Sequence, residues 1–310
     1  MAGRLMIPGV IRNPKSHGNR QTGPLGAGDG ACLFAEPSTP DDLAETLRRY
    51  AKAGVELLVI DGGDGTVREV LTAMPAAFGD SQPVVAVLPS GKTNMLALDL
   101  GAARDWSLQD ALTKAGAAEP ALKQRAPMLI SWPEGGHPPL QGFILGAAAF
   151  VRATNMAQTV HAWGAFHNVA VVVTLVGAVL RTLAGDEGHA WRGGVPMRVA
   201  ADGEPGYVRS RFLFMATALK RMPFGLKPFG QPREGLKFLD IDAPPHRLHA
   251  AIPHILKGDA DEKLAEGGYR RGDAEVLNLW IPEPFVVDGE IYPGGAVEVR
   301  LGEPITFLAP

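Results

Sequence analysis

Along the first 126 residues, hydrophobic runs typical of strands alternate with segments that carry helix signals. Short apolar runs have the length of strands, and the run that ends at Ile60 is apolar at four successive positions, as expected for a strand buried on both faces. Between these runs lie helix signals, of which the clearest is Thr39-Pro40-Asp41-Asp42, a capping residue followed by a first-turn proline and two acids. The predicted strands are 9–12, 55–60 and 83–88, and the predicted helices are 39–52, 67–74 and 94–100. Two successive strand–loop–helix units predict a parallel sheet with helices on its faces.

From residue 127 onward the pattern changes to short apolar runs separated by turn residues. The runs are 128–132, 143–148, 197–201, 212–216, 236–241, 276–279, 285–287 and 296–299. Such spacing is typical of antiparallel β-structure, and helix patterns interrupt it near 155–184 and 246–257. We therefore predict an α/β domain over residues 1–126 and a β-rich domain over residues 127–310. The final strand, near 296–309, is expected to pack back toward the first domain.

Composition and charge narrow the class of protein. Apolar residues make up 46% and charged residues 20% of the chain, which is the balance of a folded globular protein. The formal net charge of -3 argues against a nucleic-acid binder, because such proteins usually carry a basic excess. Cys32 is the single cysteine, so neither an intramolecular disulfide nor a cysteine-rich zinc site is possible.

The apolar segment 168–180 bears on whether the chain enters a membrane. At about 13 residues it falls short of the roughly 20 that span a bilayer. A buried core helix is the main interpretation, and a surface that touches acyl chains is the alternative. The first residues, interrupted by Pro8 and Gly9, make a poor signal peptide. We expect a cytoplasmic protein with transient peripheral contact at the inner membrane surface.

Two glycine-containing turns join predicted strands to predicted helices. They are residues 61–66 (DGGDGT) and residues 89–94 (PSGKTN). Glycine lets backbone N–H groups approach an anion closely, and the helix that follows favours phosphate through its free N–H groups and its dipole. Neighbouring parallel strands bring such turns to one edge of the sheet, where open α/β sheets bind their ligands.

Three phosphate-binding motifs compete for these turns. A dinucleotide fingerprint needs G-x-G-x-x-G, which Gly62-Gly63-Asp64-Gly65 does not supply. A P-loop is suggested by Gly91-Lys92-Thr93, but its first glycine position is Ala86, inside a predicted strand. The third motif fits best, because Gly62-Gly63-Asp64-Gly65-Thr66 closely resembles the GGDGT signature of diacylglycerol kinases, sphingosine kinases and the related NAD kinases.

Three further segments resemble the same family and follow its order along the chain. Asn13-Pro14-Lys15-Ser16 with Gly18 resembles the family's NP-x-S-G loop. Pro89-Ser90-Gly91-Lys92-Thr93-Asn94 resembles its P-x-G-T-x-N segment, and Asp288-Gly289-Glu290 resembles its late DGE. The resemblance implies a Rossmann-like nucleotide domain, a β-sandwich substrate domain and an ATP site in the cleft between them.

The resemblance also implies a reaction and the residues that carry it. The reaction is ATP-dependent phosphorylation of a hydroxyl on a lipid or lipid-like acceptor, with ATP and Mg²⁺ as cofactors. The residues implied to bind ATP are Asn13, Gly62, Gly63, Gly65, Thr66, Gly91, Lys92, Thr93 and Asn94. Asp64 is implied in catalysis and beside the metal, and Glu290 is the candidate general base for the acceptor hydroxyl. Phosphoryl transfer depends on such positioned carboxylates and on a metal that bridges the phosphates.

The chain departs from the family pattern at three places. Met95 stands where many relatives carry an acid, and Glu234 replaces an aspartate that holds a metal in some relatives. Lys92 displaces Thr93 by one position, and its ammonium is a candidate phosphate-neutralising cation. Two alternative functions therefore stay open: a nucleotide-binding regulatory module with weak or lost transfer, and a kinase for a non-lipid acceptor.

Several of these residues also have plainer structural interpretations. Asp61 is able to brace its turn, Thr66, Thr93 and Asn94 to cap helices, and Glu290 to stand in a hairpin turn. A basic stretch is predicted as a solvated loop, or as a loop that meets an anionic membrane or gates the acceptor; it contains Lys220, Arg221, Phe224, Lys227, Phe229, Arg233 and Lys237. His246, His249 and His254 are expected on a surface helix face and not at a metal.

Overall fold

The computed structural model describes residues 6–19, 32–154, 192–259 and 262–310. The segment 168–180 and the helix expected near 155–184 lie outside the described residues. The chain divides into two compact units, of which the first comprises Met1–Ala126 with Glu303–Pro310 and the second comprises Pro127–Gly302. The predicted fold class is confirmed: a parallel α/β unit is followed by a β-rich antiparallel unit.

The first unit is built on a six-stranded sheet in the order β2-β1-β3-β4-β17-β5. The strands are β1 (Pro8–Arg12), β2 (Leu33–Ala35), β3 (Leu57–Gly62), β4 (Val84–Pro89), β5 (Leu122–Arg125) and β17 (Ile305–Leu308). All neighbouring pairs are parallel except β17 and β5. Because β1, β3 and β4 are adjacent and parallel, the turns that follow them lie at one edge of the sheet.

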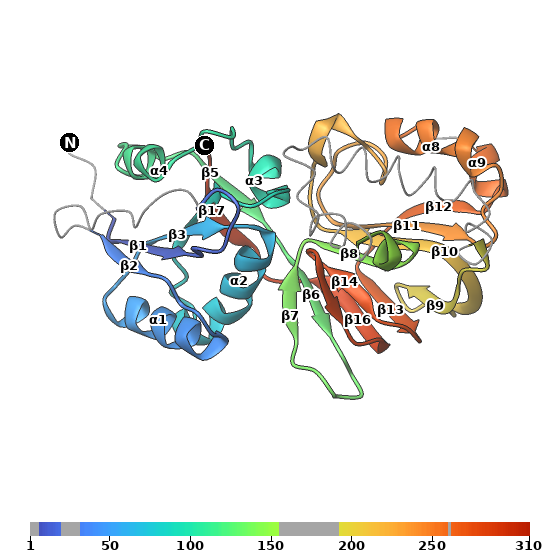
Figure 1. Cartoon of the computed structure of the whole chain (residues 1–310), viewed down its shortest axis with the longest axis horizontal. Coiled ribbons are helices and arrows are strands. Elements are labelled where there is room, and N and C mark those ends of the chain that lie inside the picture. Colours follow the sequence, from blue (N-terminus) through green and yellow to red (C-terminus); the bar gives the residue numbers. More distant parts are fainter. Residues whose placement is uncertain (1–5, 20–31, 155–191, 260–261) are drawn as a thin grey trace. The chain divides into compact units, whose positions relative to one another are not determined.

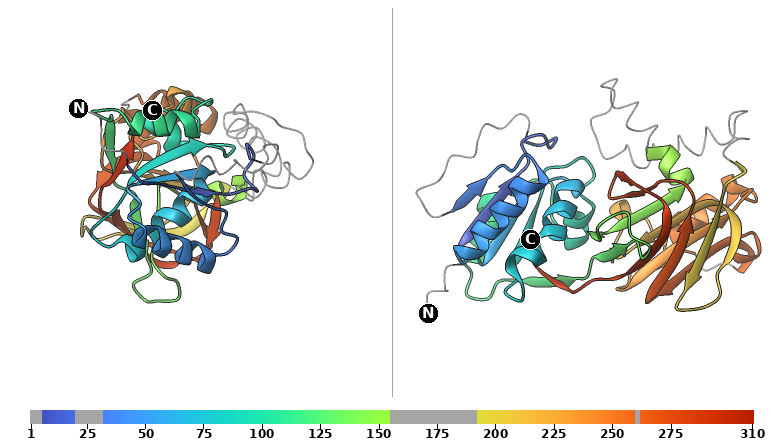
Figure 2. Two further views of the ribbon diagram at one scale, coloured as in Figure 1. Left: turned by 90° about the vertical axis from the view of Figure 1, so that its left-hand side faces the viewer. Right: turned by 90° about the horizontal axis from the view of Figure 1, so that it is seen from below.

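Helices cover both faces of this sheet. They are α1 (Pro40–Lys52), α2 (Asp64–Phe78), α3 (Met95–Leu100) and α4 (Leu108–Ala115). Figure 2 shows α1 (blue) and α4 (green) on opposite sides of the sheet, and α2 packs on β3 and on α1. Leu57 and Val59 face α4, whereas the alternate residues Leu58 and Ile60 are also fully buried. This two-sided burial explains the continuous apolar run.

The second unit has eleven described strands in one antiparallel hydrogen-bonded sheet. They are β6 (Met128–Ser131), β7 (Leu140–Gly142), β8 (Ile144–Ala148), β9 (Val195–Ala201), β10 (Tyr207–Thr217), β11 (Leu236–Asp242), β12 (Tyr269–Ala274), β13 (Val276–Ile281), β14 (Phe285–Val287), β15 (Glu290–Tyr292) and β16 (Gly295–Leu301). The long strand β10 branches the sheet, because its first half pairs with β9 and its second half with β8, while β11 pairs along the other edge. Helix α8 (Leu248–Lys257) packs on β11 through Leu248 and Ile255.

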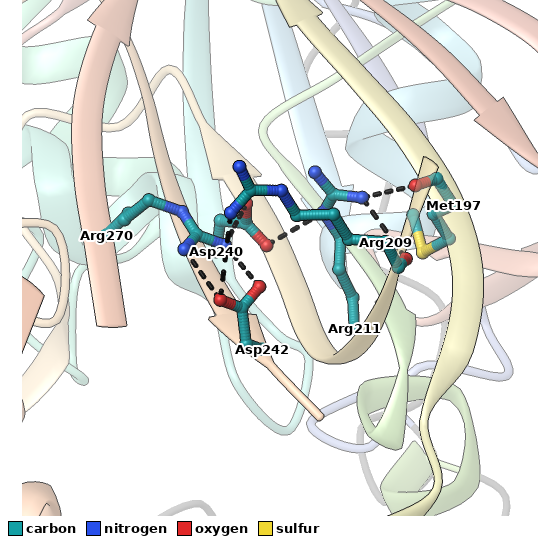
Figure 3. A network of polar contacts seen from close by, with 6 residues as sticks. All are labelled: Met197, Arg209, Arg211, Asp240, Asp242 and Arg270. Carbon is teal, nitrogen blue, oxygen red and sulfur yellow. Dashed lines mark hydrogen bonds and ion pairs between the residues drawn. The ribbon is translucent and has the colours of Figure 1, made fainter. Parts of the chain in front are cut away.

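A network of ion pairs lies on the β10, β11 and β12 branch of this second sheet (Figure 3). Arg211 and Asp240 are each 4% exposed, and the Arg211 Nε donates to Asp240 Oδ1 at 2.9 Å. Arg270 donates to the other oxygen of Asp240 at 3.1 Å and forks onto Asp242. The Arg270 guanidinium holds the pKa of the Asp242 carboxyl below its usual value. Strands β10, β11 and β12 are thereby joined by side chains as well as by backbone.

The structure corrects three expectations for the order of elements. The single strand expected near 296–309 is two strands, and β17 joins the first sheet between β4 and β5, while β16 stays in the second. The helix expected at 67–74 extends over Asp64–Phe78, with Asp64 in its first turn and Pro75 within it. Consequently Asp61 and Gly62 end β3, and Gly63 alone joins strand to helix.

The basic stretch after β10 is occupied by contacts within its own unit. Lys220 pairs with Glu234 at 2.9 Å, and Arg233 pairs with Asp273 at 2.7 Å. Lys237 is 2% exposed and donates to backbone carbonyls of the same loop. Phe229 belongs to the core under α8. Among the residues that the structure describes, no helix is long and apolar enough to cross a bilayer.

Candidate active site

The two glycine turns approach each other at the carboxyl edge of the first sheet. A side-chain carbon added at Gly91 would lie 2.5 Å from the Gly63 Cα, and one added at Gly63 would lie 3.2 Å from the Gly91 Cα. A carbon added at Gly62 would lie 2.6 Å from Thr66. Backbone therefore packs on backbone at Gly63 and Gly91, which leaves room for glycine only.

The close approach of the two turns makes Gly91→Ala a test of this packing. The new methyl group would force the turns apart, and overpacking of this kind costs about 1–3 kcal/mol of unfolding free energy. Gly116→Ala in the same unit is the matched control, because its added carbon would meet Leu112 O at an ordinary 3.5 Å. Urea denaturation should show a loss for Gly91→Ala and none for Gly116→Ala; equal stabilities would contradict the packing.

The loop after β1 contacts the first turn of α2. Asn13 Nδ2 donates to Thr66 Oγ1 at 2.9 Å, and Asn13 Oδ1 accepts from the Lys15 backbone N–H at 2.9 Å. The N-cap of α2 is Gly63 and not Thr66, so the capping interpretation of Thr66 is wrong. The Thr66 hydroxyl and the half-buried Gly65 lie in the helix's first turn, where free N–H groups favour an anion.

Asp64 joins the two glycine turns through its carboxylate. Its Oδ1 accepts from the Met95 backbone N–H at 2.7 Å, and its Oδ2 accepts from Thr93 Oγ1 at 2.5 Å. Burial raises the pKa of the Asp64 carboxyl above its usual value, and these hydrogen bonds offset part of that rise. A carboxyl group with a raised pKa at a turn is typical of functional sites.

The turn after β4 is shaped by Asn94, which adopts a left-handed conformation with φ 52°. Its side chain accepts from the Gly91 N–H at 2.7 Å and donates to the carbonyls of Pro89 and Gly91. Asn94 therefore occupies the N-cap position of α3 without capping it by its side chain. Lys92 and Thr93 project from the same turn and are exposed, so the Lys92 ammonium is accessible to an anion.

Three residues that sequence reasoning did not select complete this edge. Arg12, Asn19 and Ser90 all contact the carboxylate of Asp61. The bracing interpretation of Asp61 is thereby confirmed. Ser90 was visible only as part of a resembling segment, Asn19 only as part of a turn-rich loop, and Arg12 had no signal beyond a charge at the end of an apolar run.

Glu290 belongs to the second unit and opens strand β15. It pairs with Val287 across a two-residue hairpin whose turn residues are Asp288 and Gly289, both with positive φ. Asp288 anchors this turn, because its carboxylate accepts from the backbone N–H groups of Phe143 and Ile144 at 2.9–3.2 Å. Glu290 itself is exposed, and because it pairs with Val287 it stands just after the two turn residues.

The family model that matches this chain falls within the first unit. Residues 28–122 match the family model of the diacylglycerol kinase catalytic domain. The "Probable lipid kinase YegS" of Shigella flexneri and that of Escherichia coli O9:H4 (strain HS) are each 38% identical over 60 residues, which cover 19% of this chain and 20% of either relative. These alignments therefore span about a fifth of the relatives' length.

A solved structure extends the likeness from sequence to fold. The crystal structure of a diacylglycerol kinase from Bacillus anthracis str. Sterne superposes with a TM-score of 0.65 at 14% identity, over 99% of this chain and 98% of the other. At that identity the likeness establishes the fold. Together with the domain matched over residues 28–122, it confirms that the chain resembles the diacylglycerol kinase and lipid-kinase-like family.

Proposed function

We propose that the protein transfers the terminal phosphoryl group of ATP to a hydroxyl on a lipid or lipid-like acceptor. The observation that carries this proposal is the meeting of Gly63 and Gly91 beside the carboxylate of Asp64, in a chain segment matching a diacylglycerol kinase catalytic domain. The names of the relatives, which are described as probable lipid kinases, support the proposed acceptor class.

The first unit supplies the proposed phosphate contacts. Gly62, Gly63 and Gly65 allow close approach of backbone N–H groups at the start of α2. The Thr66 hydroxyl, held by Asn13, and the exposed Lys92 ammonium add a donor and a cation. Asn94 shapes the neighbouring turn through Gly91, and Thr93 holds the Asp64 carboxylate.

The donor set at this edge also fits Mg²⁺. Mg²⁺ is commonly held by one or two carboxylates together with substrate phosphates. Each Asp64 oxygen accepts one hydrogen bond from the protein and keeps lone-pair capacity for a metal. When bound with ATP, Mg²⁺ supplies charge neutralisation on the phosphates. Asp64 is the proposed ligand, because its carboxylate lies between the two glycine turns.

Glu290 is the proposed general base for the acceptor hydroxyl. Its support is the hairpin anchored by Asp288 and the exposure of its own side chain. Glu290→Gln should lower kcat by about 10²–10⁴-fold, the usual size of general-base catalysis, with the dissociation constant for ATP unchanged. Glu275→Gln, which removes another exposed acid of the same unit, should leave kcat unaltered. A Glu290→Gln variant within threefold of wild type would exclude this role.

The proposal is tested by incubating the purified protein with γ-labelled ATP, Mg²⁺ and a whole-cell lipid extract. Labelled lipid, identified by mass, would establish both the transfer and the acceptor. Acceptance of the label by a water-soluble alcohol and by no lipid would move the protein to a non-lipid kinase. We propose in addition that the protein works in the cytoplasm and meets its acceptor at the inner membrane surface.

A nucleotide-binding module without transfer is the second candidate function. Met95, where many relatives carry an acid, contributes only its backbone N–H to Asp64. The site thus has one carboxylate fewer than expected for an efficient kinase. Tight ATP binding with no labelled product across lipid and soluble acceptors would favour this candidate.

A further inference from the structure

Asp61 is a buried acid that accepts hydrogen bonds from the loops after the two neighbouring strands, β1 and β4. It is 4% exposed at the end of β3. Asn19, in the loop after β1, donates to Asp61 Oδ1 at 3.0 Å and also to the Asp61 carbonyl at 3.2 Å. Ser90, in the turn after β4, donates to the same carboxylate oxygen.

A buried cation completes the contacts of Asp61. Arg12 ends β1, is 2% exposed, and lies with its Nε 3.5 Å from Asp61 Oδ2. Burying a carboxylate is unfavourable unless it is paired and hydrogen-bonded. A strand can end without a buried charge. The placement of Arg12, Asn19 and Ser90 around the Asp61 carboxylate therefore indicates a role beyond ending the strand.

The loops held by Asp61 are those that carry the proposed phosphate contacts. Asn19 also donates to the Asn13 carbonyl at 3.1 Å, and Asn13 holds Thr66. The Gly18 N–H donates to the Ser90 carbonyl at 2.9 Å, which ties the first loop to the third. Ser90 immediately precedes Gly91, whose backbone packs on Gly63. Each loop is thus linked to Asp61 directly or through one neighbour.

We propose that Asp61 is a positioning residue for the nucleotide. It holds the loops after β1, β3 and β4 in their binding arrangement without touching the ligand. The inference rests on the proposed function, because it assumes that ATP binds to these loops. In a preorganised site, none of the binding free energy is lost to ordering the loops. Without the charge of Asp61 the competent arrangement is one of several, and the apparent affinity falls by the fraction populated.

The test is Asp61→Asn, which keeps the size of the side chain and one acceptor oxygen. The dissociation constant for ATP·Mg²⁺, measured by calorimetry, should rise about tenfold, and kcat at saturating ATP should stay within about threefold, because bound nucleotide restores the arrangement. This split separates positioning from catalysis, since loss of a catalytic group lowers kcat. Ser90→Ala should weaken binding in the same direction, and the double variant should be less than additive.

Asp99→Asn is the matched control for stability. Asp99 and Arg125 form another buried ion pair of the same unit, at 2.6 Å, so this variant should lose stability without losing ATP affinity. Folded Asp61→Asn that binds ATP as tightly as wild type would overturn the inference. So would an affinity loss of equal size in Asp99→Asn.

A second readout separates this inference from the proposed function. If wild type binds no ATP, the proposed function fails, and the inference is then judged without nucleotide. Hydrogen exchange at the Gly18 and Gly91 amides, both of which donate within these loops, should be at least tenfold faster in Asp61→Asn than in wild type. Unchanged exchange at both amides would refute the positioning role.

Discussion

Asp64→Asn is expected to lower phosphoryl transfer by at least about 100-fold, the loss typical for removal of one preorganised electrostatic contact. The variant also removes the proposed metal ligand, and an amide binds Mg²⁺ more weakly than a carboxylate. An asparagine side chain can still accept from the Met95 N–H, so the fold should be kept. The measurement is the initial rate of labelled-product formation at saturating ATP and Mg²⁺.

The same variant should keep or gain stability while it loses activity. Because burial raises the pKa of Asp64, the folded protein binds this proton more tightly than the unfolded chain does. The contribution to stability is therefore complete below the unfolded pKa, near 4, and is lost as the pH rises through the raised pKa. Relative to Asp64→Asn, wild type should become less stable as the pH rises from the unfolded pKa of Asp64 to its raised folded pKa.

An inactive Asp64→Asn variant that is also unfolded would leave no case for a catalytic role of Asp64, and a fully active variant would exclude that role.

Asp240→Asn is expected to cause the largest loss of stability in the second unit. Arg211 is 4% exposed, and removal of its partner's charge leaves a buried cation unpaired, which costs about 3–5 kcal/mol. At roughly 2–4 °C per kcal/mol for a protein of this size, the melting temperature should fall by about 6–20 °C. Calorimetric melting at neutral pH measures the shift.

Arg209→Gln is the matched control within the same network (Figure 3). The Arg209 side chain is 53% exposed and lies 4.0 Å from Asp242. Pairs of this kind contribute less than about 1 kcal/mol, so the melting temperature should hardly change. A loss in Asp240→Asn no larger than that in Arg209→Gln would contradict the proposed role of burial.

Local sequence signals predicted the parts of the fold that depend on neighbouring residues. Thr39 caps α1 as predicted, because its hydroxyl accepts from the Asp42 N–H three residues later. The apolar run through Ile60 became a central strand, since burial on both faces leaves a continuous pattern. Antiparallel structure after residue 127 followed from regular turn spacing, and the helix predicted near 246–257 is α8.

Contacts between residues far apart in the sequence could not be predicted from local sequence signals. Residues 305–308 form an ordinary short strand pattern, and nothing local states that this strand joins the first sheet. Strands β2 and β7, each three residues long, are too short to give a period. The Asp61 contacts join residues 42 and 29 positions apart, so the sequence indicated a bracing acid without its partners. The motif residues Asp64 and Gly91 were found because their pattern repeats across a family.

The most direct test of the account is hydrogen–deuterium exchange of the wild-type protein with and without ATP·Mg²⁺. Bound nucleotide is expected to slow exchange in residues 13–19, 62–66 and 90–94, the three segments at the carboxyl edge of the first sheet. Protection confined to other segments, or no protection at millimolar ATP, would contradict it.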